Sequence, residues 1–178
     1  NLSIIDILSV LFLDHINKNS QNKFILSKGH ACLSYYIALS LRGYFDLKNL
    51  HNYGKENTVF LNHSHHKVPG VLFSTGSLGH GLPHALGLAI AQKKKKIRGK
   101  IFVLLSDGEL NEGSNWEALS LISKLKIDNL YILVDGNGIQ SIDFTKDVTD
   151  YRNIKQIIKN FNLDYLSADG HNHIDIKR

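Results

Sequence analysis

The sequence predicts an α/β fold in which a doubly wound, mainly parallel sheet is flanked by helices. Short apolar runs rich in β-branched residues alternate with segments of helical periodicity, which is the pattern of an open parallel sheet. The chain has 178 residues, of which 43% are hydrophobic and 21% are charged. This balance is typical of a globular domain that buries its own core, so we expect residues 1–178 to form one domain.

The first half of the chain is expected to hold three helices and one strand. The helices are expected at 2–16, 31–41 and 46–53, and a short strand is expected at 23–26. Gly43 follows the second helix, where a residue in the left-handed conformation commonly ends a helix. Residues 57–70 have no periodicity, so we expect a surface loop there.

The second half is expected to alternate strands with helices. Strands are expected at 101–105, 130–134 and 163–166, the first two buried, and helices at 82–94 and 154–161. Ser114 and Glu117 have the spacing of a capping box, which predicts the start of another helix. The buried stripe of that helix is expected to be Trp116, Leu119, Ile122 and Leu125.

Composition excludes several classes of protein. The single cysteine, Cys32, cannot form an internal disulfide, which excludes a disulfide-stapled scaffold and favours a reducing, cytoplasmic location. We interpret Cys32 as a small buried helix residue. No apolar stretch reaches the ~18 residues of a membrane helix, and the first residues lack the basic region of a signal peptide. The net charge of +5 forms no basic stripe, and the run Lys93–Lys96 suits a solvated helix end, so nucleic-acid binding is not expected.

Polar residues follow two neighbouring predicted strands, where the carboxyl ends of parallel strands bind ligands. Asp107 offers a carboxylate after one strand, and Asn137 offers an amide oxygen after the next. With one backbone carbonyl they would form an incomplete Mg²⁺ site, which diphosphate oxygens and water typically complete. Gly108 allows the backbone to approach a phosphate. Taken alone, an Asp-Gly pair after a strand also fits an ordinary turn.

The spacing of these residues resembles the thiamine-diphosphate signature, in which Gly-Asp-Gly precedes a distant Asn. The resemblance implies that Asp107, Asn137 and the carbonyl of Ile139 hold the metal. The chain departs from the pattern at Ser106 and Gly136, neither of which would supply a ligand side chain.

Further motifs narrow the resemblance to transketolases. Residues 27–31, Ser-Lys-Gly-His-Ala, resemble the Ser-x-Gly-His segment of that family. Residues 69–81 resemble its Pro-Gly-Val and Thr-Gly-x-Leu-Gly-x-Gly segments, and the 107–139 block follows in order. The chain is most similar to the N-terminal subunits of transketolases whose gene is split. The predicted sheet would then be a thiamine-diphosphate-binding fold.

The resemblance also implies roles for individual residues. His30 and His63 would be catalytic, with His30 touching substrate and cofactor, and Glu112 would be an interface glutamate that couples two active sites. The implied cofactor-binding residues are His30, Gly76, Ser77, Leu78, Gly108, Glu109, Asp135 and Asn137. A histidine suits proton transfer near neutral pH, although His30 would also suit a helix cap.

The histidine-rich loop allows more than one interpretation. His63, His65 and His66 could suggest zinc, but no cysteine or acid accompanies them, and a solvated loop is a further alternative. The family has a substrate-facing histidine shortly before Pro-Gly-Val, which favours His63 and leaves His66 as a substitute. His84 is interpreted as a core or interface residue, and His80 as a weaker site candidate.

A transketolase would transfer a two-carbon ketol unit between sugar phosphates, with thiamine diphosphate and Mg²⁺ as cofactors. It would need a pyrimidine-binding domain or subunit, in a homodimer or a heterotetramer. The family continues beyond an Asp-Gly-His turn like residues 169–171 with a further strand and histidine, so we expect this chain to be truncated at its C-terminus.

Three alternatives remain open at this point. Another thiamine-diphosphate enzyme, such as a deoxyxylulose-phosphate synthase, would share Asp107 and Asn137, and a non-catalytic subunit would bind the cofactor without turnover. A dinucleotide-binding module is the third, although the glycines at 76, 79 and 81 have the wrong order for its fingerprint.

Overall fold

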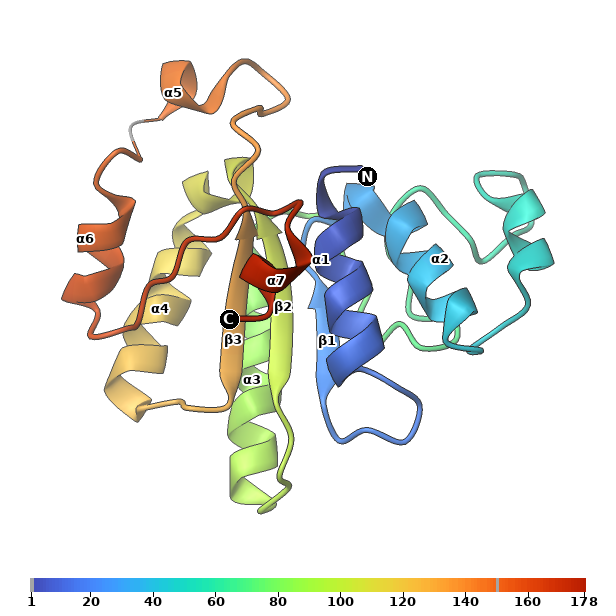
Figure 1. Cartoon of the computed structure of the whole chain (residues 1–178), viewed down its shortest axis with the longest axis horizontal. Coiled ribbons are helices and arrows are strands. Elements are labelled where there is room, and N and C mark those ends of the chain that lie inside the picture. Colours follow the sequence, from blue (N-terminus) through green and yellow to red (C-terminus); the bar gives the residue numbers. More distant parts are fainter. Residues whose placement is uncertain (1, 150) are drawn as a thin grey trace.

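A computed structural model describes residues 2–149 and 151–178 and confirms the α/β fold with a parallel sheet (Figure 1). The sheet has three strands in the order β1-β2-β3, all parallel. Their bounds are Lys23–Leu26 for β1, Ile101–Ser106 for β2 and Leu130–Asp135 for β3. Lys23 lies beside Ile101, which lies beside Leu130, so the strands start level with one another.

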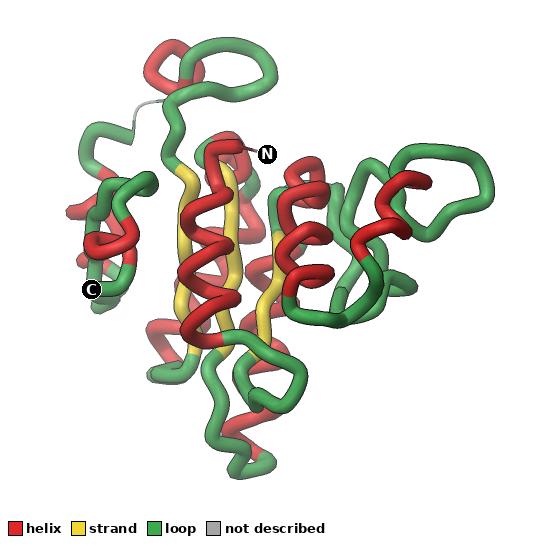
Figure 2. Tube along the Cα trace, turned by 45° about the vertical axis from the view of Figure 1, so that its right-hand side comes forward, coloured by secondary structure: helices red, strands yellow, loops and turns green. Residues whose placement is uncertain are grey.

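Helices cover both faces of the sheet, as the doubly wound arrangement requires. Figure 2 shows α1 (Ile5–Val10) lying in front of the strands. Alternate strand residues face this side together with α2 (Cys32–Leu41): Phe24, Leu26, Phe102 and Leu104. The others face α3 (Gly81–Lys94) and α4 (Gly113–Leu125): Ile25, Ile101, Val103 and Leu105. Every residue of β2 is buried, which confirms it as a central strand.

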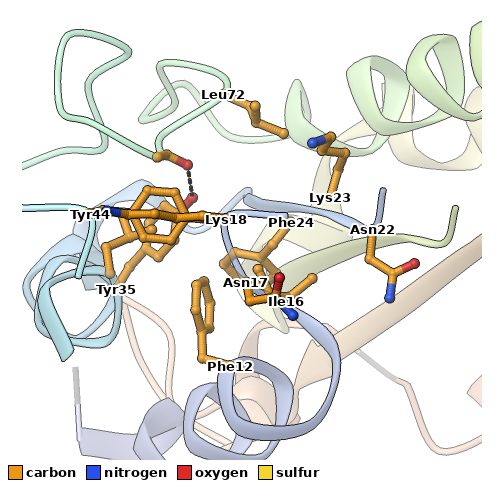
Figure 3. A pocket seen from close by; sticks show the side chains of 12 residues that line it. Phe12, Ile16, Asn17, Lys18, Asn22, Lys23, Phe24, Tyr35, Tyr44 and Leu72 are labelled. Atoms are coloured by element: carbon orange, nitrogen blue, oxygen red, sulfur yellow. Dashed lines mark hydrogen bonds between the residues drawn. The ribbon is translucent and has the colours of Figure 1, made fainter. Parts of the chain in front are cut away.

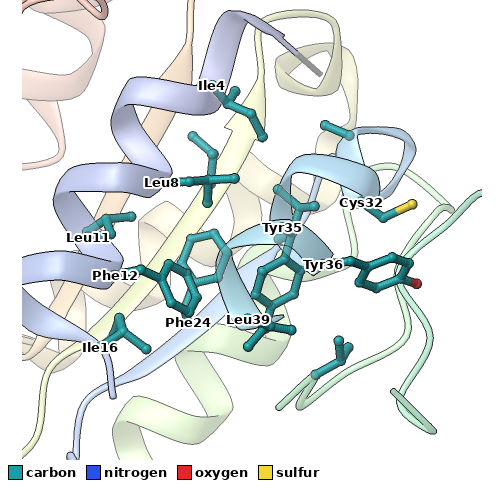
Figure 4. Close-up of a cluster of buried hydrophobic side chains, with 14 of the residues drawn as sticks. Ile4, Leu8, Leu11, Phe12, Ile16, Phe24, Cys32, Tyr35, Tyr36 and Leu39 are labelled. Carbon is teal, nitrogen blue, oxygen red and sulfur yellow. The ribbon is translucent and has the colours of Figure 1, made fainter. Parts of the chain in front are cut away.

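The core beneath α1 is built around aromatic rings (Figure 4). The Phe24 ring lies edge-on to Phe12 at 5.6 Å and to Tyr35 at 5.1 Å between centroids, a favoured geometry. A 3-10 turn at Leu2–Ile4 and a π-helical segment at Leu11–His15 extend α1, which confirms the helical region predicted at 2–16. Cys32 is fully buried here, and burial raises the pKa of its thiol.

The strand predicted at 130–134 is present as β3, but the prediction that it is buried is wrong. Tyr131 and Val134 of β3 are 42% and 41% exposed. The reason is that β3 has a neighbour on one side only in the described residues. The expected strand at 163–166 is also wrong, because that run pairs with no described strand and leaves Leu166 83% exposed.

Local capping explains further differences from the predicted helices. α4 begins at Gly113 with Glu112 as its N-cap, so the capping box at Ser114 is not formed. The Ser114 hydroxyl instead donates to the Gly79 carbonyl at 2.7 Å. Leu119 and Ile122 are buried, but Leu125 is 46% exposed because the helix ends there.

The remaining helices are short. The expected helix at 46–53 is a 3-10 segment, Leu47–Asn52. α6 (Ile154–Asn160) confirms a prediction, whereas α5 (Thr145–Val148) and α7 (His173–Ile176) had no sequence signal. His84 is exposed and its ring lies tilted against the ring of Phe73, so it is not a core residue. None of the helices in the described part of the chain has the length and apolar character that a membrane crossing requires.

A small cavity of about 120 Å³ lies around the start of β1 (Figure 3). Its wall combines the apolar side chains of Phe12, Phe24 and Leu39 with Lys18 and Lys23. None of the predicted site residues lines it.

α7 is held against α1 by a carboxylate that two histidines share. His171 Nδ1 and His173 Nε2 each lie 2.8 Å from an oxygen of Asp6. Hydrogen bonding to these rings lowers the pKa of Asp6 below 3.8, and hydrogen bonding to Asp6 raises the pKa of His171 above 6.5. The contact therefore stabilises docking above about pH 3.8 and loses strength once the pH rises through the raised pKa of His171.

We expect amide hydrogens of α7 to exchange faster at about pH 8 than at about pH 5.5, after correction for intrinsic exchange, because His171 loses its charge. Hydrogen exchange followed by NMR measures this. The Asp6→Asn variant should remove the difference. Equal protection at both pH values would contradict the expectation.

Candidate active site

The loops that follow β2 and β3 meet at the carboxyl end of the sheet, at the top of Figure 1. The backbone N–H of Asp107 donates to the carbonyl of Asp135 at 3.2 Å, which joins the two loops. The structure thus brings together the segments that the sequence placed there.

The carboxylate of Asp107 is buried and held by three donors. Oδ2 accepts hydrogen bonds from the Gly138 N–H at 3.0 Å and the Thr145 hydroxyl at 2.6 Å. Oδ1 accepts the Gly108 N–H at 2.9 Å. A carboxylate has about four lone-pair positions, so one position on Oδ1 is left for a further partner. A cation is the partner that the negative charge favours.

Asn137 is oriented by hydrogen bonds at both ends of its amide. Its Oδ1 accepts the Ile139 N–H at 2.9 Å, and its Nδ2 donates to Asp135 Oδ2 at 3.1 Å. Gly138, with φ of +78°, turns the chain between them. Ile139 is 62% exposed and pairs with Phe144 in an isolated antiparallel bridge. The two predicted ligands of this loop therefore share one tight turn.

Asp135 lies at the end of β3 and is nearly inaccessible. Lys28 Nζ lies 2.5 Å from its Oδ2, and the Ser3 hydroxyl donates to the same atom at 2.7 Å. Burial alone would raise the pKa of Asp135, but the hydrogen bonds from Lys28, Ser3 and Asn137 outweigh it and lower the pKa. The carboxylate is therefore ionised within the protein.

Glu109, which the resemblance places among the cofactor-binding residues, has its side chain inside the protein. Its side chain is fully buried, and its carboxylate accepts from the Ser27 hydroxyl, from the Gly79 N–H at 2.9 Å and from the Ser106 N–H at 3.4 Å. Burial raises the pKa of Glu109. The side chain ties the ends of β1 and β2 to the glycine turn, which makes it part of the scaffold in this structure. Gly108 beside it is half-buried and starts a 3-10 turn.

The glycine turn packs against both predicted histidine segments. A Cβ on Gly29 would lie 2.7 Å from the Thr75 backbone, so only glycine permits this approach. A Cβ on Gly76 would lie 2.9 Å from the His63 ring. His63 is therefore the histidine that lies at the turn, whereas His66 pairs with Ser74 Oγ at 2.8 Å.

The exposed surface of the turn is formed by Ser77, with Leu78 half-buried beside it. His30 is exposed as well, at the start of the helical segment that leads into α2. Partial burial lowers the pKa of His30, and the charge of Lys28 lowers it further. The ring is therefore largely neutral near neutral pH and offers a free proton acceptor.

Glu112 lies beside the same turn but points to the outside of this chain. A Cβ on Gly79 would lie 2.6 Å from Glu112 Cβ. The Glu112 residue is exposed in the single chain, so the interface role that the resemblance implies stays a prediction.

Comparison with known proteins decides the family. Residues 1–178 match a protein family that is described as "Transketolase, thiamine diphosphate binding domain". The chain belongs to the transketolase family. Its α/β fold also matches solved transketolases, such as that of Campylobacter jejuni, with a TM-score of 0.90 and 32% identity over 97% of this chain and 29% of that one.

Curated relatives of this transketolase domain include two proteins that are named as subunits. One, from Actinobacillus succinogenes, is a subunit of an apulose-4-phosphate transketolase and is 43% identical over 156 residues, covering 83% of this chain and 56% of the relative. The protein of the same name from Phocaeicola vulgatus is 31% identical over 185 residues, covering 100% and 66%. The chain thus spans between about half and two thirds of these relatives.

The donor set of this transketolase domain fits a hard cation such as Mg²⁺, which prefers carboxylate and carbonyl oxygens. Asp107 Oδ1 has an open lone-pair position, and Asn137 Oδ1 already faces the Ile139 turn. Across residues 2–149 and 151–178, no group of three or more His, Cys, Asp or Glu side chains is arranged so that it could hold a metal ion. The proposed Mg²⁺ site is of a different kind, because its ligands are one carboxylate, one amide oxygen and one backbone carbonyl.

Sequence reasoning missed the residues that support this site. Lys28 lies within the Ser-Lys-Gly-His motif, but the motif assigns it no role. A lysine directly after an apolar strand, with an aspartate at the end of another strand, would have been the signal. Thr145 and Ser3 carried no sequence signal. Their hydroxyl groups donate to Asp107 and Asp135, which lie 38 and 132 residues away in the sequence.

Proposed function

We propose that this chain is the diphosphate- and magnesium-binding half of a transketolase that moves a two-carbon ketol unit between sugar phosphates. The observation that carries the proposal is the buried Asp107 carboxylate, which keeps one oxygen position open at the carboxyl end of the sheet. Thiamine diphosphate, when bound, supplies the carbanion chemistry of the reaction. The chain's own residues would bind, orient and exchange protons.

Three oxygens of the chain would hold Mg²⁺: Asp107 Oδ1, Asn137 Oδ1 and the carbonyl of Ile139. Mg²⁺ would neutralise part of the negative charge of the diphosphate, and the N-terminus of the 3-10 turn at Gly108 would also favour that charge. Gly76, Ser77 and Leu78 would line the cofactor from the side of the glycine turn. The buried Glu109 holds that turn in place through the Gly79 N–H.

His30 and His63 would act on the sugar. A neutral His30 ring accepts a proton from a substrate hydroxyl and returns it later, and its lowered pKa keeps it in the accepting form. His63 lies against Gly76, where it would contact the sugar phosphate beside the cofactor.

A second polypeptide or domain would complete the active site. Two relatives of which this chain covers 56% and 66% are named as transketolase subunits, which supports a separate partner chain that binds the pyrimidine ring. The exposed Tyr131 and Val134 of β3 and the exposed Glu112 are surfaces that such an assembly would cover. We propose a homodimer of complete protomers or a heterotetramer.

Ketol transfer is expected only when the chain is combined with a pyrimidine-binding partner. Coupled assays would test ketose phosphate donors, xylulose 5-phosphate among them, with ribose 5-phosphate as acceptor. A panel of donors has to be tested, because the relatives of this chain are named for different sugars. Full turnover by this chain alone would sink the half-site proposal, and cofactor binding without turnover for any donor would show a non-catalytic role.

A further inference from the structure

A buried ion pair crosses the sheet directly beneath the candidate site. Lys28 Nζ lies 2.5 Å from Asp135 Oδ2, with side chains only 2% and 7% exposed. Lys28 follows β1, and Asp135 ends β3, so the pair passes over the end of the central strand. The Lys28 backbone N–H donates to the Leu104 carbonyl of β2 at 3.2 Å, which fixes its position. Burying two charges costs free energy, so the presence of the pair is weak evidence that it stabilises the fold.

Asp135 controls which way the amide of Asn137 faces. Asn137 Nδ2 donates to Asp135 Oδ2 at 3.1 Å, and Asn137 Oδ1 accepts the Ile139 N–H at 2.9 Å. A half-turn of the amide would set its oxygen against the carboxylate and its NH₂ group against the Ile139 N–H. Both contacts would be repulsive, so the pair of hydrogen bonds selects one orientation. Only that orientation presents an oxygen, and not a nitrogen, on the side of Ile139.

The charge of Lys28 allows the Asp135 carboxylate to stay ionised although it is buried. Lys28, Ser3 and Asn137 all donate to the same oxygen, Asp135 Oδ2. Without the ammonium group, a buried carboxylate would retain only neutral donors. Water or a rotated side chain would then satisfy the charge, and the acceptor for Asn137 Nδ2 would move.

We propose that Lys28 and Asp135 are positioning residues that lock the Asn137 amide with its oxygen toward the bound cation. The inference rests on the proposed function, since it assumes that Asn137 is a ligand. It assigns Lys28 no contact with the cation. Partners of this kind around a metal are typically worth about 10- to 100-fold in metal affinity.

The test measures Mg²⁺ affinity by calorimetry in the full chain assembled with its pyrimidine-binding partner, with thiamine diphosphate saturating. Lys28→Met keeps most of the length of the unbranched side chain and removes its charge. It is expected to weaken Mg²⁺ binding about 10- to 100-fold. Lys93→Met is the matched control, because it removes an exposed ion pair with Asp128 and should leave Mg²⁺ affinity unchanged.

Two double variants separate positioning from stability. Lys28→Met/Asp135→Asn has no buried charge but keeps an oxygen acceptor, so it should regain most of the Mg²⁺ affinity. Lys28→Met/Asp135→Leu has no acceptor for Asn137 Nδ2 and should not. The comparison also stands if Lys28→Met alone fails to fold, and melting temperatures are recorded in parallel.

Equal Mg²⁺ affinity in the two double variants overturns the inference, whatever their melting temperatures. Wild-type affinity in Lys28→Met overturns it as well. If a double variant loses its fold only when the acceptor is removed, the pair is structural and the inference fails. Failure of the proposed function would look different, because the wild-type assembly itself would then show no Mg²⁺-dependent binding of thiamine diphosphate.

Discussion

Asp107→Ala is expected to abolish Mg²⁺-dependent binding of thiamine diphosphate while the chain keeps its fold. Asp107 would supply the only full negative charge among the three proposed ligand groups. Its loss should therefore exceed the roughly 10- to 100-fold effect typical of residues that only support a ligand. Calorimetry in the assembled enzyme, with and without Mg²⁺, measures the affinity.

The fold should survive because the core lies in the two apolar layers on either side of the sheet. Some loss of thermal stability is expected, since Gly138 and Thr145 would lose their shared acceptor. Asp143→Ala is the matched control, because this exposed carboxylate lies in the neighbouring loop after β3 and, among the described residues, accepts a local N–H from Phe144. Unchanged affinity in Asp107→Ala would defeat the assignment of the ligand.

The central strand and the metal loop were predictable because their signals are local. A run of five apolar residues, such as 101–105, predicts a strand that is covered on both faces, as in the middle of a parallel sheet. In the structure every residue of this strand is buried. Parallel strands end at one edge, so Asp107 and Asn137 had to come close once both strands existed. The resemblance to transketolases added residue roles, but the meeting of the two loops follows from topology.

The edge of the sheet was not predictable from the chain itself. The pattern of β3 allows either a buried or a half-exposed strand, and the outcome depends on what pairs beyond it. Residues 163–166 are of types that favour strands. However, Leu163 packs against the apolar layer that faces α3 and α4, and residues 163–166 pair with no described strand. Whether a segment at the edge of a sheet forms a strand depends on the strands and side chains it can pair with, and not on its β-propensity alone.

The support of the site was missed because it is built from contacts between distant segments. Glu109 reads as a polar residue after a glycine, yet it is fully buried and binds Ser27, which lies 82 residues earlier. Lys28 stands in a motif that gives it no role, yet its side chain is 2% exposed. A buried charge needs a partner, and single-sequence patterns do not reveal partners across such distances.

His30→Ala is expected to slow ketol transfer by about 100-fold or more and to leave cofactor affinity nearly unchanged, because the role proposed for this histidine is proton transfer to and from the substrate. Partial burial and the charge of Lys28 lower the pKa of His30 below 6.5, so the neutral ring should be active down to mildly acidic pH. In the wild type, kcat/KM should fall only below that lowered pKa, and the variant should lack this acid limb.

His66→Ala is the matched control, since His66 is also exposed but pairs with Ser74, whereas His63 is the histidine that lies against Gly76. It should retain wild-type kcat/KM across the same pH range. Turnover at the wild-type rate in His30→Ala would show that the histidine is merely the start of a helical segment. A parallel fall in cofactor affinity and rate would instead place His30 in cofactor binding, because a group that acts only on the substrate lowers the rate without lowering cofactor affinity.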